Sequence, residues 1–210
     1  MHRSEAGRLH VIAGPMFAGK TEELLRRVRR SRLAGARVEV IGHALDTRAG
    51  AERLRTHLGA SLPARMMSTP GELSPLLAGE PPDLVAIDEA QFFGPGLVPA
   101  IDALLDAGVQ VEAAGLCVTY DGDGFEPVPT LMALAEEVVK LTAVCTVCGR
   151  DAAFHVRLAG STGDPRSATA EQVGGVESYQ ARCRRHRDLR ETGASGAPGA
   201  GSAPRAASSG

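Results

Sequence analysis

The chain of 210 residues has no tryptophan, and aromatic residues make up only 3% of it. A core must therefore be built mainly from Ala, Val, Leu and Ile, so each aromatic side chain that remains calls for an explanation. No apolar run is long enough to span a bilayer, and the first ten residues lack the hydrophobic segment of a secretory signal. We therefore expect a cytoplasmic protein that has no membrane partner.

Neither positive nor negative charge is in large excess, because the formal net charge is −2 at pH 7. A near-neutral balance predicts no broad electrostatic attraction to nucleic acid. Lysine is scarce in a chain rich in arginine, and Lys20 and Lys140 are the two examples. Where lysine persists, its compact ammonium group can matter for function.

Residues 1–144 alternate short apolar runs with longer helical patterns, which predicts an α/β domain with a parallel sheet and helices on its faces. Helices are expected from Gly19 or Lys20, from near Gly96, and over 129–138, where Leu131, Leu134, Ala135 and Val138 would share one face. Strands are expected over residues 8–14, 37–43, 83–88, 109–116 and 139–145.

The composition changes at Cys145. Residues 145–190 contain short polar strands and a long Gly-rich loop, which indicates a small metal-stapled domain. Residues 191–210 are almost entirely Gly, Ala, Ser and Pro, so burial cannot offset chain entropy and we expect a disordered tail.

The segment GPMFAGKT fits the phosphate-loop pattern G-x-x-x-x-G-K-[ST], and it lies between an expected strand and an expected helix. Its glycines let backbone N–H groups approach phosphate oxygens, while Lys20 would reach the β- and γ-phosphates and Thr21 would bind Mg²⁺. In the alternative interpretation, the segment is a Gly-rich strand-to-helix turn whose lysine is there by chance. The expected ATP site is Gly14, Pro15, Met16, Phe17, Ala18, Gly19, Lys20 and Thr21.

Asp88 and Glu89 close the third expected strand, at the sheet edge where α/β proteins bind ligands. Asp88 would hold the magnesium shell, which leaves Glu89 to take a proton from the group that attacks the γ-phosphate. The pair does not say whether that group is water or a substrate hydroxyl. In the alternative interpretation, Glu89 merely caps the next helix.

Aromatic side chains gather near this pair. Phe92 and Phe93 follow Gln91, Tyr120 and Phe125 lie in the loop after the fourth strand, and Tyr179 comes later. Such rings could stack on a flat ligand, or they could simply fill the core.

Two knuckles, Cys145-x-x-Cys148 and Cys183-x-x-His186, offer three thiolates and one imidazole, which suits a closed, structural Zn²⁺ site. Disulfides or unligated thiols are the alternatives, and a reducing compartment disfavours disulfides. Cys117 lies outside the pattern and is expected to be a small buried residue. His155 is expected to be a packed polar residue rather than a ligand.

The ordered set GPMFAGKT, DTR (46–48), DEAQFF, LAEEVVKLTAVCTVCG, VGGVESY and CRRH resembles the type II thymidine kinases over residues 8 to 187. The resemblance implies ATP-dependent phosphorylation of the thymidine 5′-hydroxyl, a RecA-like sheet domain, and a small zinc domain with a lasso loop that closes over the base. It also implies a homotetramer.

Residue roles implied by this resemblance add to those read from the motifs. Lys20, Glu89 and Arg48 would be catalytic, with Glu89 as general base and Arg48 near the acceptor 5′ position. The thymidine site would comprise Met16, Asp46, Phe92, Leu116, Phe125, Val173, Gly174, Gly175, Val176 and Tyr179.

Three positions depart from the family pattern: Cys117 replaces an Asp, Tyr120 a Phe, and His155 a small hydroxyl residue. Two other functions stay open from the residues themselves. One is a RecA-like DNA-dependent ATPase, which would need a basic groove. The other is a zinc ribbon that binds nucleic acid, which would need exposed aromatics among its basic residues, and CRRHRDLR has none.

Overall fold

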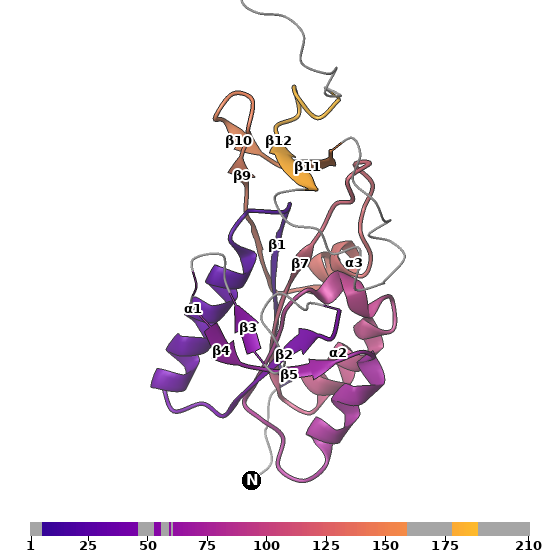
Figure 1. Ribbon diagram of the computed structural model, residues 1–210. Helices are drawn as coiled ribbons and strands as arrows, with labels where there is room; N and C mark the ends of the chain where they lie inside the picture. Colours follow the sequence, from indigo (N-terminus) through magenta and orange to yellow (C-terminus); the bar gives the residue numbers. More distant parts are fainter. Residues whose placement is uncertain (1–5, 46–52, 56–58, 60, 159–177, 189–210) are drawn as a thin grey trace, which may run out of the picture.

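A six-stranded parallel sheet forms the centre of the molecule in the computed structural model, which describes residues 6–45, 53–55, 59, 61–158 and 178–188 (Figure 1). Each neighbouring pair of strands is parallel, so the carboxyl ends of the strands lie at one edge. In spatial order the strands are β5 (Arg65–Met67), β2 (Val38–His43), β6 (Leu84–Ile87), β7 (Gln110–Leu116), β1 (Leu9–Gly14) and β8 (Glu137–Lys140).

Helices cover both faces of the sheet (Figure 1). Helix α1 (Lys20–Leu33) buries Leu24, Leu25 and Val28 against one face. On the other face lie α2 (Leu97–Asp106), α3 (Val128–Leu134) and the 3-10 helix η2 (Pro70–Leu77). Successive strand residues point to opposite faces, and the two apolar clusters divide the buried strand side chains between them.

Short antiparallel strands stand above the carboxyl edge of the sheet (Figure 1). Strand β9 (Ala143–Val144) pairs with β10 (Asp151–Ala152), and β11 (Phe154–Arg157) pairs with β12 (Tyr179–Arg182). We call residues 143–158 and 178–188 the Cys/His unit. A separate hairpin joins β3 (Arg53–Arg55) to β4 (Ser61–Pro63), and a 3-10 turn η3 (Ala90–Phe93) follows β6.

The α/β fold with a parallel sheet is confirmed, and so are four of the five expected strands. The expected strand over 139–145 is wrong in detail, because the chain there forms β8, which joins the sheet, and β9, which joins the Cys/His unit. Strand β5 has only three residues, and the sequence patterns did not predict it. The division at 144–145 stays a prediction.

The expected helix over 129–138 is also wrong in its second half. Helix α3 ends at Leu134, which is 53% exposed, and Glu137–Lys140 pairs with β1 as an edge strand. The Glu136 side chain accepts a hydrogen bond from Leu9 N at 2.7 Å. Strand β1 would otherwise expose its backbone groups, so pairing with β8 outweighs the local helical pattern.

Within the described ranges, no helix is both long and apolar enough to cross a membrane.

Candidate active site

The segment from Gly14 to Thr21 turns the chain from the end of β1 into α1. Two residues of this turn have a positive φ, a conformation that is common only for glycine. Gly19 has φ 80°, and Phe17 has φ 67°. A Cβ on Gly14 would lie 2.8 Å from Leu141 O, which is too close for any other residue. The first N–H groups of α1 therefore lie at a compact turn, an arrangement suited to phosphate oxygens.

Lys20 is the first residue of α1, and it is 9% exposed. Its Nζ donates to Pro15 O at 2.9 Å, so the ammonium lies within the loop rather than in solvent. A cation held within this loop suits the binding of a phosphate group.

Asp88 follows β6 and contacts the phosphate loop directly. Thr21 Oγ1 donates to Asp88 Oδ2 at 2.9 Å, and Glu89 N donates to Asp88 Oδ1 at 3.0 Å. Burial, reinforced by the neighbouring Glu89 carboxylate, raises the pKa of Asp88 to about 7. A hydroxyl and a buried carboxylate are the hard oxygen ligands that Mg²⁺ prefers, and a cation there would stabilise the ionised form of Asp88.

Glu89 lies beside Asp88 with φ 51°, in the left-handed region that few non-glycine residues adopt. Glu89 is the N-cap residue of η3, but its side chain makes no capping hydrogen bond, so no such bond supports the helix-cap interpretation. Instead, Gln91 Nε2 donates to Glu89 Oε2 at 2.6 Å. Glu89 is therefore a half-buried carboxylate at the edge of the phosphate loop, and its chemistry allows it to accept a proton.

The aromatic and apolar residues expected near the acidic pair differ in how deeply they are buried. Phe93 is 6% exposed and belongs to the apolar core of the sheet, as the core-filling interpretation predicts. Phe92 is half-buried, with its ring centroid 5.7 Å from that of His43. Tyr179 is buried on β12, 5.8 Å from the His155 ring. Leu116 is buried at the end of β7, and Met16 and Phe125 are half-buried.

Several expected site residues lie outside the described residues: Asp46, Arg48, Val173, Gly174, Gly175 and Val176. Their assigned contacts with thymidine stay predictions.

Cys145, Cys148, Cys183 and His186 come together in the Cys/His unit, with their ligand atoms all within 4.8 Å of one another. Cys148 Sγ and Cys183 Sγ are 3.8 Å apart, and all of the cysteines are free, so the cluster contains no disulfide. Burial opposes ionisation of Cys145, but hydrogen bonds from the Cys183 backbone and from His186 lower its pKa to about 5. Thiolates and an imidazole at these distances can hold a metal ion.

The buried side chains around the cysteines also contact the phosphate loop. Phe17 and Ala18 pack against a small buried cluster that contains Cys145 and Cys183. Because Phe17 has an unusual backbone conformation, this packing helps to fix the shape of the loop. The phosphate loop and the Cys/His cluster are therefore linked by direct packing.

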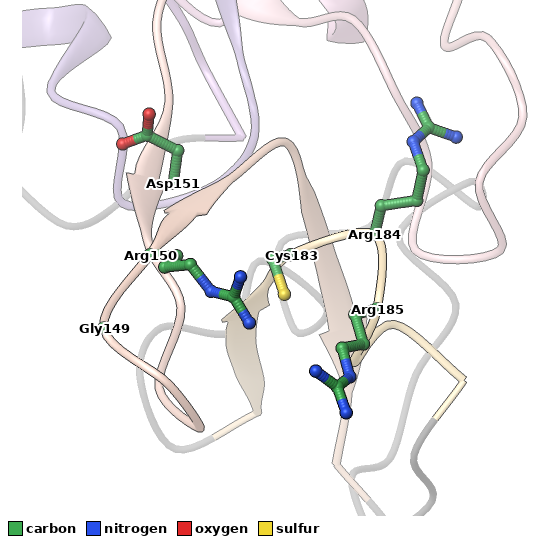
Figure 2. A pocket seen from close by; sticks show the side chains of 6 residues that line it. All are labelled: Gly149, Arg150, Asp151, Cys183, Arg184 and Arg185. Carbon is green, nitrogen blue, oxygen red and sulfur yellow. The ribbon is translucent and has the colours of Figure 1, made fainter.

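A surface pocket lies on the Cys/His unit, next to Cys183 (Figure 2). Its lining contains none of the residues expected to bind ATP or thymidine. In Figure 2 the Arg150 side chain extends toward Cys183, and hydrogen bonding to Cys148 together with the nearby thiols raises the pKa of Arg150. Arg150 therefore complements the negative charge of the metal ligands. The lining is Gly149, Arg150, Asp151, Cys183, Arg184 and Arg185.

The three departures from the family pattern each have a place in the structure. Cys117 is buried in the sheet core, which confirms the expectation of a small buried residue. Tyr120 is half-buried in the loop after β7. His155 is buried on β11, and burial together with the charge of Lys20 lowers its pKa to about 4, so it is a neutral packed side chain.

Comparison with known proteins gives a consistent result. A family model described as thymidine kinase matches residues 7–187. Thymidine kinase of Deinococcus deserti is 43% identical over 191 residues, which cover 86% of this chain and 94% of the relative. The enzyme of Deinococcus radiodurans is 44% identical over 83% of this chain and 87% of the relative. That of Thermococcus kodakarensis is 39% identical over 86% of this chain and 93% of the relative.

Proposed function

The chain belongs to the thymidine kinase family, and we propose that it transfers the γ-phosphate of ATP to the 5′-hydroxyl of thymidine, giving dTMP and ADP. The observation that carries this proposal is the contact between the phosphate loop and the acidic pair. Thr21 Oγ1 donates to Asp88 at 2.9 Å, and Glu89 stands next to Asp88 at the same edge. One carboxylate can thus serve the nucleotide while the other serves the acceptor.

The reaction then needs mainly positioning and charge balance. The 5′-oxygen attacks the γ-phosphorus in line, the bond between that phosphorus and the bridging β–γ oxygen breaks, and Glu89 takes the 5′-hydroxyl proton. Lys20 and Arg48 stabilise the negative charge that spreads over the phosphoryl oxygens. Thr21 and Asp88 would hold Mg²⁺, which shields the charge of the triphosphate when it is bound.

We assign the thymine base to the space between the sheet edge and the Cys/His unit. Apolar and aromatic side chains from three directions support this assignment: Phe92 after β6, Leu116 at the end of β7, and Tyr179 on β12. Met16 and Phe125 complete the group, and Asp46 and the backbone of 173–176 are proposed to contact the nucleoside.

We further propose that the ion in the Cys/His unit is Zn²⁺ with a structural role. Zinc–ligand bonds of about 2.3 Å to sulfur and about 2.0–2.1 Å to nitrogen separate tetrahedral ligand atoms by about 3.8 Å (S···S) and about 3.5 Å (S···N). The separations here are 3.8 Å for Cys148–Cys183, and 3.4 and 3.6 Å from His186 Nδ1 to Cys183 and Cys145. Four protein ligands leave no open position for catalysis.

One rival function, the nucleic-acid-binding ribbon, receives less support. A nucleic-acid-binding ribbon would present exposed aromatics among its basic residues, but Phe154 is 9% exposed, and the Arg184 and Arg187 guanidinium groups lie 5.1 and 5.0 Å from the centroid of its ring. These arginines cover a buried ring. The homotetrameric assembly and the cytoplasmic location stay predictions.

A direct assay tests the proposed function. The protein is incubated with ATP, Mg²⁺ and thymidine in the absence of DNA, and nucleoside monophosphate and ADP are separated by chromatography. We expect dTMP and ADP in equal amounts, with ADP formation falling to background when thymidine is omitted. In a parallel incubation with DNA in place of thymidine, ADP formation would support the ATPase instead.

A further inference from the structure

Gln91 is a buried polar residue to which neither the phosphate-loop motif nor the acidic pair assigns a role. It lies in the 3-10 turn η3, two residues after Glu89, and it is 3% exposed. Burying an amide side chain is costly unless its donor and acceptor groups are both used. The structure shows that both ends of this amide have partners.

The orientation of the Gln91 amide is fixed by its surroundings. Leu116 N, at the end of β7, donates to Gln91 Oε1 at 2.9 Å. Because a backbone N–H can only donate, the amide oxygen must face Leu116, and the NH₂ group must face the other way. That group donates to Glu89 Oε2 at 2.6 Å.

The position of Gln91 depends on the glycine before Leu116. A Cβ on Gly115 would lie 2.8 Å from Gln91 Oε1, 2.8 Å from Val128 Cγ2 and 3.3 Å from Ala90 Cβ. The end of β7 can approach the η3 turn this closely because residue 115 has no side chain. Sheet, turn and amide therefore form one close-packed support.

Glu89 needs such a support, because its backbone is in the left-handed region with φ 51°. Its N–H is held by Asp88 Oδ1 at 3.0 Å, and its carboxylate is held by Gln91. The first contact connects Glu89 to the magnesium-binding residue, and the second connects it to the sheet strand next to β1.

We propose that Gln91 is the positioning residue for the general base: anchored on the backbone of Leu116, it aims the Glu89 carboxylate at the acceptor hydroxyl. The inference rests on the proposed kinase function. A general base must lie within hydrogen-bond reach of the proton that it accepts, and the Gln91 amide fixes one of the two oxygens of the Glu89 carboxylate.

Two variants of Gln91 separate anchoring from donation. In Gln91→Glu the new carboxylate can still accept from Leu116 N, but it cannot donate to Glu89 while ionised. In Gln91→Leu both hydrogen bonds are lost. Gln110→Leu is the matched control, because Gln110 Nε2 also donates to a glutamate, Glu112 Oε1 at 3.4 Å, but at the opposite edge of the sheet.

The measurements are kcat and KM for thymidine and ATP at one pH, together with Tm for each variant. We expect kcat to fall on the order of 10- to 100-fold in both Gln91 variants, with KM for ATP nearly unchanged. KM for thymidine should change less than kcat, because Gln91 acts on the base and not on nucleoside binding. Gln110→Leu should leave kcat and both KM values close to wild type.

A double-variant cycle completes the test. If Gln91 acts through Glu89, Gln91→Glu should cost little further kcat in a Glu89→Gln background. Unchanged kcat in both Gln91 variants, or full additivity in the cycle, would overturn the proposal, and a loss confined to Tm would assign Gln91 a purely structural role. If the wild-type protein forms no dTMP at all, the proposed function fails instead, and the two failures are thus distinguishable.

Discussion

Buried side chains differ in kind between the sheet domain and the Cys/His unit. The two apolar clusters of the sheet contain large aliphatic side chains such as Ile12, Leu24 and Ile101 at 0% exposure. The buried cluster of the Cys/His unit consists of Ala143, Cys145, Ala152, Ala181 and Cys183. Two larger apolar side chains of this unit, Phe154 and Tyr179, are also buried, at 9% and 4% exposure. The sheet can be stabilised by apolar burial, whereas we expect the smaller Cys/His unit to depend in addition on a metal bound by its cysteines and histidine.

This difference assigns separate tasks to the two regions. The sheet edge carries the phosphate loop, Asp88 and Glu89, so the bond-breaking chemistry is expected there. The Cys/His unit supports that edge from above, through the packing of Phe17 and Ala18 against its buried cluster. Variants can test whether the division holds.

Glu89→Gln should have the largest effect on activity. The amide keeps the size of the side chain but cannot accept the proton, so kcat should fall by about 10²- to 10⁴-fold. ATP binding, measured by calorimetry, and zinc content should stay close to wild type. Glu126→Gln, at an exposed glutamate that bonds Thr130, is the control. Equal losses of kcat and ATP affinity in Glu89→Gln would contradict the separation of tasks.

Cys148→Ser should destabilise the Cys/His unit and leave the sheet domain folded. We expect zinc affinity to fall on the order of 100-fold or more, since one thiolate ligand is lost. Hydrogen exchange should increase over 143–158 and 178–188, while β1, β6 and β7 stay protected. ATP affinity should also decrease, because Phe17 and Ala18 lose part of their support.

Cys117→Ala provides the matched cysteine control, because Cys117 is buried in the sheet core, away from the metal ligands. Its zinc content should equal that of the wild type. Loss of protection throughout the sheet in Cys148→Ser would show that the two regions form one cooperative unit.

How far the sequence alone predicts this molecule depends on how local each feature is. The phosphate loop and the Asp88–Glu89 pair are contiguous motifs, and the structure brings them together at 2.9 Å. The second half of the expected helix over 129–138 was wrong because the need of β1 for a partner strand is not visible in the local pattern. The link from Gln91 to Leu116 spans 25 positions, so no motif contains it.

Ile101→Ala tests how far the stability of the sheet domain depends on apolar burial. The side chain is 0% exposed in the α2 layer, so its truncation should lower the free energy of unfolding by about 2–5 kcal/mol. Denaturant unfolding in the presence of zinc measures this loss. Ala181→Val, in the Cys/His unit, should instead disturb zinc binding and leave the main unfolding transition nearly unchanged. A reversed pattern would contradict the account of the two cores.

His155→Gln should have the smallest effect, and it should appear only in acid. The pKa of His155 is lowered to about 4, below the value of about 6.5 in an unfolded chain. As pH falls through this window the unfolded state takes up the proton first, so the folded protein loses stability between about pH 6.5 and pH 4. The loss from pH 7 to pH 5 should be roughly 1–2 kcal/mol smaller in the variant than in the wild type, measured by urea unfolding. Equal losses would mean that His155 is not held neutral in the folded state.

A crystal structure of the protein with thymidine, Mg²⁺ and a non-hydrolysable ATP analogue tests the central claim most directly. We expect the thymidine 5′-oxygen within about 2.6–3.2 Å of the Glu89 carboxylate and in line with the γ-phosphorus held by residues 14–21. A nucleoside bound elsewhere, or a 5′-oxygen out of reach of Glu89, would contradict the account.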